Sequence, residues 1–309
     1  MMRLRSAFAL AQMRLANTTK RLLIHFKLVK KNTQYFAAVN EIVTPYTGFI
    51  VSNYYYSNEI EFFKYSWLNP RSKRINKRRA SRIKPMSVVY CQTDMLKNFV
   101  EKYLPYVNNP IILISGKWQL PGLEQKDLAK EILADKKIFT WFSQNQIFED
   151  LPIQPFPYGV RIDNSSEFLS LRWRSDSLRE SNPLIPYARV HTHTPNEYRE
   201  FRIKLQNRMN ILKTFQDYKN DLISHKYVVC TPGDRPDTYR HWETLACGAI
   251  PVCLDHANFR KLFGESAVYV KQFDEASIFK ALQADHKYNK SLINVDYWRE
   301  RVKQFVLEK

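Results

Sequence analysis

Short apolar segments alternate with segments of helical periodicity along most of the chain, and this alternation restricts the fold more than any other feature. In the first half, strands are expected at residues 86–91, at 109–116 and within 136–145, and residues 153–160 close this block. A helix is expected at 95–107, between the first two strands. Strands and helices that alternate through short turns are typical of a parallel sheet. The sequence therefore predicts an α/β fold.

The second half of the chain repeats the pattern. Expected strands are residues 186–194, 225–230, 249–254 and 265–270, and expected helices are 195–218, 274–283 and the amphipathic tail from 294 onward. We predict two separate α/β sheets that are joined near residues 160–185. A length of 309 residues is typical of two domains of ordinary size. We assign residues 1–165, of which 1–85 are basic, to the first domain, 166–290 to the second, and 291–309 to a closing helix.

Polar residues follow the expected strands of the first half. In parallel sheets, ligands bind at the carboxyl ends of the strands. This rule places five residues at one mouth of the first sheet: Thr93, Asp94, Ser115, Gly116 and Asn145.

Residues 231–255 combine a loop rich in proline and glycine, a short helix and a strand. Asp237 is the expected N-cap of the helix, and Gly248 is expected to end it. A helix N-terminus offers free N–H groups and positive potential to a phosphate. Arg240 could add a bidentate clamp, and Glu243 could accept two hydrogen bonds from a ribose diol. The alternative is a surface ion pair between these two residues, worth a few tenths of a kcal/mol.

Residues 227–252 resemble the donor-binding segment of exostosin-like glycosyltransferases, and the match is closest over residues 237–252. The family pattern is approximately Cys-Pro-x-Gly-x-x-x-Asp-[Ser/Thr]-x-Arg-x-Trp-Glu-x-Leu-x-x-Gly-x-Ile-Pro-Val. Looser similarity to viral and microbial transferases extends the resemblance to residues 86–270. Residues 1–85 lie outside it.

The resemblance implies a GT-B fold, in which two Rossmann-like domains face each other across a cleft. It implies an enzyme that moves a sugar from a nucleotide-sugar, usually a UDP-sugar, to a hydroxyl of a glycan acceptor. The first domain would hold the acceptor and the second the donor. Glu243 would then bind the ribose, and Arg240 with Thr238 would bind the diphosphate. The remaining donor-site candidates are Asp237, Arg235, Gly233, His193, Thr194 and Arg199, although the loop with Gly233 and Arg235 is shorter than the family's loop.

An inverting transferase needs a general base from the acceptor domain. Asp94 is the expected base, and His191 and His193 are its competitors. The chain contains no Asp-x-Asp motif, which fits a metal-independent enzyme of this family. Helix dipole and cationic side chains would then neutralise the leaving diphosphate. We expect neither a metal site nor a cofactor, since the two histidines lack a third ligand at a suitable spacing. The four cysteines are expected to be reduced thiols in the core.

The formal net charge of +18 predicts an anionic partner. Much of the positive charge lies before residue 86, because the first acidic residue is Glu41 and residues 71–85 contain no acid. The N-terminal segment reads as a transit peptide, a membrane-surface helix or a basic first element of the domain. Residues 71–85 read as a solvated loop or as a phosphate contact, and they lack the aromatic residues that stack on single-stranded bases.

We expect a cytoplasmic enzyme whose basic segment docks on an anionic membrane leaflet, without specific nucleic-acid binding. No run of 18 apolar residues is present. Two other functions fit parts of the sequence. One is a nucleic-acid-binding protein that uses the basic first third of the chain. The other is a catalytically inactive, transferase-like scaffold.

Overall fold

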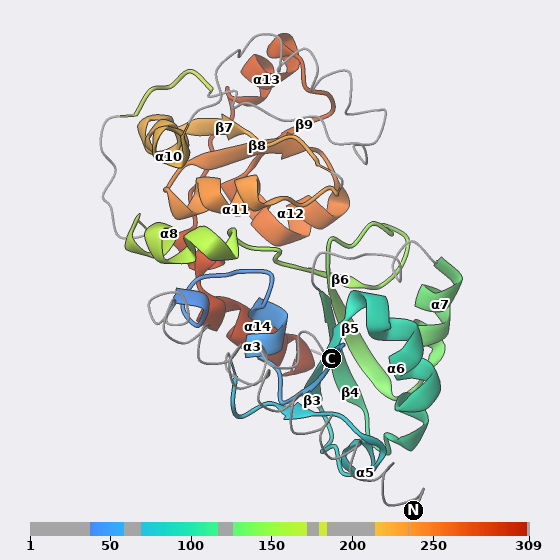
Figure 1. Ribbon diagram of the computed structural model, residues 1–309. Helices are drawn as coiled ribbons and strands as arrows, with labels where there is room; N and C mark the ends of the chain where they lie inside the picture. Colours follow the sequence, from blue (N-terminus) through green and yellow to red (C-terminus); the bar gives the residue numbers. More distant parts are fainter. Residues whose placement is uncertain are drawn as a thin grey trace, which may run out of the picture.

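The computed structural model describes residues 38–58, 69–116, 126–171, 179–183, 214–233 and 235–307. A six-stranded parallel sheet forms the first half of the molecule, with the strand order β2-β1-β3-β4-β5-β6 (Figure 1). Its strands are β1 (Tyr54–Tyr56), β2 (Lys73–Arg74), β3 (Ser87–Gln92), β4 (Ile111–Gly116), β5 (Ile138–Gln144) and β6 (Gln154–Phe156). The predicted α/β fold with a parallel sheet is confirmed for this half.

Helices cover both faces of the first sheet (Figure 1), so the central strand β4 is buried along its whole length. On one face, Phe99 of α6 packs in the same buried cluster as Trp141 of β5. On the other face, Phe49 of α3 contacts Tyr90 of β3, with ring centroids 6.1 Å apart. The helices and 3-10 turns of this half are α3 (Thr47–Ile50), α5 (Lys77–Ala80), η1 (Thr93–Met95), α6 (Leu96–Lys102), η2 (Leu104–Tyr106) and α7 (Lys126–Ala134).

The basic run at 71–85 is not the solvated loop that the sequence favoured. It contains β2 and α5, and its apolar residues Ile75, Ala80 and Ile83 are buried in the core of the first sheet. The basic side chains between them point outward, because burial of an unpaired charge is costly. The first sheet therefore begins at Tyr54, upstream of the first predicted strand. In the part of the chain that the structure describes, no helix is long and apolar enough to cross a membrane.

The second half contains a smaller parallel sheet, with the order β7-β8-β9 among the described strands. Its strands are β7 (Tyr227–Val229), β8 (Ile250–Leu254) and β9 (Val268–Val270). They match three of the predicted strands, whereas the predicted strand at 186–194 lies outside the described residues. The surrounding helices and turns are η3 (Ile162–Asn164), α8 (Ser165–Leu171), α10 (Phe215–Ser224), α11 (Tyr239–Ala246), α12 (Ala257–Phe263), η4 (Gly264–Ser266), α13 (Glu275–Ala281) and η5 (Lys290–Ile293).

The helix predicted at 195–218 is helical from residue 215 in its described part, but its predicted end is wrong. The backbone of Thr214 is extended, and its side chain accepts a hydrogen bond from Asp217 N. Thr214 is therefore the N-cap of α10, which runs on to Ser224 instead of ending at residue 218. The earlier part of that predicted helix lies outside the described residues.

The predicted C-terminal helix is confirmed as α14 (Val295–Leu307), and it packs against the first sheet rather than the second (Figure 1). Trp298 contacts Phe156 of β6, with ring centroids 5.7 Å apart, and Phe305 contacts Phe142 of β5 at 5.4 Å. The chain thus returns to the sheet that it formed first.

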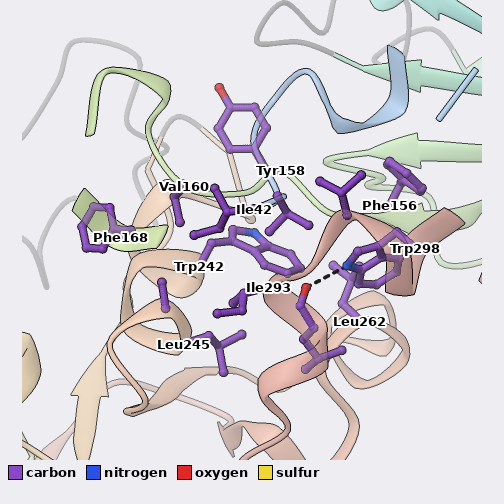
Figure 2. Close-up of a cluster of buried hydrophobic side chains, with 14 of the residues drawn as sticks. Ile42, Phe156, Tyr158, Val160, Phe168, Trp242, Leu245, Leu262, Ile293 and Trp298 are labelled. Carbon is purple, nitrogen blue, oxygen red and sulfur yellow. Dashed lines mark hydrogen bonds between the residues drawn. The ribbon is translucent and has the colours of Figure 1, made fainter. Parts of the chain in front are cut away.

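A continuous apolar cluster joins the two halves of the molecule, and Figure 2 shows Trp242 of α11 at its centre. The Trp242 ring lies 6.1 Å from that of Trp298, whose Nε1 donates to Leu292 O at 2.8 Å (Figure 2). Gly159 lies on the segment that crosses between the halves, and it has φ +85. A Cβ there would lie 2.4 Å from Thr44 N, so this close crossing of two backbones requires glycine.

Candidate functional site

The carboxyl ends of strands from both sheets meet at one junction. Asn145 directly follows β5, and its Oδ1 accepts a hydrogen bond from the backbone N–H of Asp237 at 3.0 Å. Asp237 lies in the loop between β7 and α11. A second contact joins Asn258 Nδ2, at the start of α12, to Gln146 O at 2.9 Å. The strand ends at which ligands bind in parallel sheets therefore face each other here.

Asp237 connects the halves through its side chain as well. Its carboxylate accepts hydrogen bonds from Trp242 Nε1, at 2.8 and 3.0 Å, and from Tyr158 N at 3.1 Å. Burial raises the pKa of Asp237 to about 7, although these hydrogen bonds favour the ionised form. The predicted N-cap role of Asp237 is wrong, because its oxygens are directed to Trp242 and Tyr158. The cap is Thr238, one residue later.

Thr238 begins α11 together with His241. The backbone N–H of Thr238 donates to His241 Nδ1 at 3.2 Å, as in a capping box. His241 is fully buried, and this burial lowers its pKa to about 3. The imidazole is therefore neutral near pH 7, and its 3.7 Å approach to Asp237 Oδ1 is not an ion pair there. Gly248 has φ +76 and follows the C-cap, so the predicted end of the helix is confirmed.

Glu243 lies inside the protein, not at an open mouth as the sequence suggested. Glu243 is only 6% exposed, and its Oε2 accepts a hydrogen bond from Tyr218 OH at 2.9 Å. Burial raises the pKa of Glu243, and the nearby charge of Arg240 counteracts this effect. The alternative of an ion pair between Arg240 and Glu243 on the surface is therefore wrong, because Glu243 is buried. Tyr218, Arg240 and Glu243 instead form a polar cluster between α10 and α11.

The candidates of the first half divide into two groups. Thr93 and Gly116 adjoin at the carboxyl ends of β3 and β4, where Thr93 Oγ1 donates to Gly116 O at 3.0 Å. All three residues are buried. Ser115 Oγ donates to Ser143 Oγ and accepts from Trp141 Nε1, both at 2.8 Å, so its hydroxyl is already used inside the sheet. The placement of these residues at a ligand mouth stays a prediction.

Asp94 lies where the sequence placed it, in the 3-10 turn that follows β3, and it is half-buried. Its role as a base stays a prediction. In the donor loop, Gly233 N donates to Arg235 O at 2.9 Å, so the chain turns sharply there. His191, His193, Thr194 and Arg199 lie outside the described residues. Within the described ranges, no group of three or more His, Cys, Asp or Glu residues could hold a metal ion.

Among the buried polar atoms near the junction that have no hydrogen-bond partner among the described residues, two follow the ends of β5 and β7. They are Asn145 Nδ2 and Thr231 Oγ1, on residues that are 4% and 1% exposed. Buried polar atoms are normally satisfied by protein, water or ligand, so both could contact a ligand. The sequence reasoning missed Thr231. The carboxyl-end rule could have found it, because Thr231 lies two residues beyond the end of β7.

The fold and the junction define a mixed α/β protein with two parallel sheets and a polar meeting point at their carboxyl ends. No protein-family model matches the chain, and no curated protein matches it either.

Proposed function

We propose that the chain is a glycosyltransferase of the GT-B type, which transfers a sugar from a nucleotide-sugar, most simply a UDP-sugar, to a hydroxyl of a glycan acceptor. One observation carries this proposal. The segment that resembles the exostosin-like donor motif folds as a strand, a loop and a helix, and its loop meets the carboxyl end of β5 through Asp237 and Asn145. A transferase needs donor and acceptor sites at such a junction of two sheets.

The groups around the N-terminus of α11 suit a nucleoside diphosphate. The helix start supplies backbone N–H groups and positive potential, and Arg240 adds a cation for the diphosphate. Glu243 donates no hydrogen bond when ionised, but its carboxylate has about four acceptor positions, of which Tyr218 uses one. This leaves acceptor capacity for a ribose diol. Thr231 and Asn145 each offer a buried polar atom to the donor.

The chemistry follows from this placement. Asp94 would take the proton of the acceptor hydroxyl as its oxygen bonds to the anomeric carbon of the donor sugar. The bond from that carbon to the diphosphate oxygen would break, and the diphosphate would leave as an anion. Arg240 and the N-terminus of α11 would stabilise the negative charge that develops on the leaving group. Thr93 and Gly116 lie at the sheet edge assigned to the acceptor.

Calorimetry and thermal shift with UDP, GDP and dTDP and their sugars test the proposal. UDP should bind at physiological salt, and Arg240→Gln should weaken binding. The control Arg78→Gln changes an exposed cation on α5 and should have no effect. A steep salt dependence of DNA or RNA binding, without nucleotide binding, would favour the nucleic-acid-binding alternative. A chain that binds neither class would be an inactive scaffold.

A further inference from the structure

A cavity of about 520 Å³ opens beside β1 and β2, on the side of the first sheet away from β5 and β6. We call it the β1–β2 pocket. The last residues of β1 and β2 and those just after them line the pocket, together with one residue each from α5 and η1 and the residue that follows α6. These residues are Tyr56, Ser57, Asn58, Arg74, Ile75, Asn76, Arg79, Met95 and Tyr103. Its volume falls in the usual range of small-molecule sites. It lies at the carboxyl ends of the two strands, where parallel sheets bind ligands.

The pocket is separate from the junction of the two sheets. In the strand order, β3 and β4 lie between β1 and β5. Three spacings between neighbouring strands put the two places about 14 Å apart. A ligand in the β1–β2 pocket therefore does not need the donor site, and binding there can be measured whether or not the chain transfers sugar.

Two arginines give the pocket its charge. Arg74 ends β2, and Arg79 belongs to α5, where its Nη1 donates to Arg74 O at 2.9 Å. Asn76 Oδ1 accepts a hydrogen bond from Arg79 N at 2.8 Å. These two hydrogen bonds hold the turn between β2 and α5 in place. None of the described lining residues is acidic. A planar guanidinium pairs with two oxygens of a phosphate through parallel hydrogen bonds, which favours phosphate over a neutral ligand.

Two tyrosines form an aromatic wall of the pocket. Tyr56 and Tyr103 pack against each other with ring centroids 4.7 Å apart. Tyr56 OH is engaged with Asn98 Oδ1, which fixes the ring. A wall of two held rings offers an apolar surface to the carbon skeleton of a ligand, as such rings do in most small-molecule sites.

We propose that the β1–β2 pocket binds the phosphate ester of a small polar molecule, with the phosphate on Arg74 and Arg79 and the organic part against Tyr56 and Tyr103. Two residues of the basic run at 71–85, Arg74 and Arg79, then bind the phosphate. Its other cations, including Arg78, do not line the pocket.

Calorimetric titration of the full chain, at constant ionic strength, tests this proposal with glucose 6-phosphate, inorganic phosphate and glucose as probes. The wild type should bind glucose 6-phosphate saturably, inorganic phosphate more weakly, and glucose at least about tenfold more weakly. Arg74→Gln and Arg79→Gln should each reduce the affinity for the sugar phosphate by about tenfold. Arg78→Gln removes the same charge one residue from Arg79, outside the pocket, and should change the affinity by less than about twofold.

Three results would overturn the proposal: no saturable binding of glucose 6-phosphate, equal binding of glucose, or an equal loss of affinity in Arg78→Gln. The last result would indicate diffuse attraction to a basic surface. Tighter binding of inorganic phosphate than of the ester would contradict the role of the tyrosine wall. Thermal melts of each variant identify loss of folding, and Arg79→Gln, which changes an exposed side chain, keeps the test valid if Arg74→Gln does not fold.

Discussion

Asn145 Oδ1 accepts a hydrogen bond from the backbone N–H of Asp237 at 3.0 Å, and so joins two residues that are 92 positions apart in the chain. Asn145 has φ +53, a conformation that asparagine tolerates better than most residues. Its side chain can therefore turn from the end of β5 toward the loop that follows β7. This bond sets the position of the candidate donor loop relative to the first sheet.

Asn145→Ala should lower the free energy of unfolding by about 2 kcal/mol. The variant loses the hydrogen bond to Asp237, and alanine is strained at positive φ. Asn145→Gly is the matched control, because it loses the same bond without the strain, and should cost about 1 kcal/mol. Urea unfolding of both variants measures the difference. Equal stability of the two would mean that the backbone at this position is relaxed.

Glu243→Ala should destabilise the fold by about 2 kcal/mol, since Tyr218 OH would lose its buried acceptor. For the ribose role, Glu243→Gln is the better variant, because its amide oxygen can still accept from Tyr218. It should weaken UDP binding by on the order of 3 kcal/mol. Tyr218→Phe removes the internal bond and keeps the carboxylate, so it should affect unfolding more than UDP binding. Unchanged calorimetric affinity for UDP in Glu243→Gln would contradict the ribose assignment.

The raised pKa of Asp237 predicts a pH-dependent effect of Asp237→Asn. Burial raises the pKa from 3.8 to about 7, so between these values the native state binds more protons than the unfolded state. The stabilising contribution of Asp237 is complete below pH 3.8 and is lost as the pH rises through about 7. The stability difference between wild type and Asp237→Asn should therefore shrink over this range, by at most about 1.4 kcal/mol per pH unit.

His241 has the opposite effect on how the free energy of unfolding depends on pH. It is present in both the wild type and Asp237→Asn, so its effect is common to both. Its pKa falls from 6.5 to about 3, so its contribution is complete above pH 6.5 and is lost as the pH falls through about 3. In the wild type the two effects offset each other over the shared range. Urea unfolding at several pH values measures the difference between the proteins. A difference that grows with pH would show that the Asp237 carboxylate is stabilised in its ionised form.

Transfer activity should survive EDTA, because the donor-site candidates include cations for the diphosphate and the chain lacks Asp-x-Asp. The measurement is turnover of a UDP-sugar before and after chelation. Turnover that is lost on chelation and restored by Mn²⁺ or Mg²⁺ would contradict the metal-independent mechanism.

Anionic vesicles should bind the chain through exposed cations of the basic run that lie outside the β1–β2 pocket. A triple variant with Arg78, Arg82 and Lys84 changed to Gln should lose on the order of 3 kcal/mol of vesicle affinity at low salt. Transfer to a soluble acceptor should be unaffected. A matched triple variant changes exposed lysines of the other half to Gln: Lys261, Lys280 and Lys287. Equal losses in the two triple variants, or no vesicle binding by the wild type, would contradict docking through this run.

The central strands of both sheets could be predicted because each is a short apolar run, as in the predicted strand at 109–116 and the observed β4. The strands β1 and β2 could not. β2 consists of Lys73 and Arg74, and an edge strand of two basic residues has no apolar signal. Its pairing depends on β1, and Tyr54 opposes Lys73 across 19 positions of chain.

The candidate site was predictable only where its residues are close together in the sequence. The sequence between Thr238 and Gly248 predicts where α11 starts and ends. The observed N-cap, Thr238, lies one residue after the predicted N-cap, Asp237. The error arose because Asp237 is bound by Tyr158, 79 positions away. The burial of Glu243 likewise depends on Tyr218, on another helix. Local patterns carry no information on such partners.

The return of α14 to the first sheet has a consequence for the order of events during synthesis. The strands of the first sheet are synthesised before α14, but Phe142 and Phe156 pack against Phe305 and Trp298 of that helix. An apolar face of the nascent first half therefore stays uncovered until α14 has been synthesised. Deletion of α14 would leave that face exposed and make the product a substrate for chaperones and proteases.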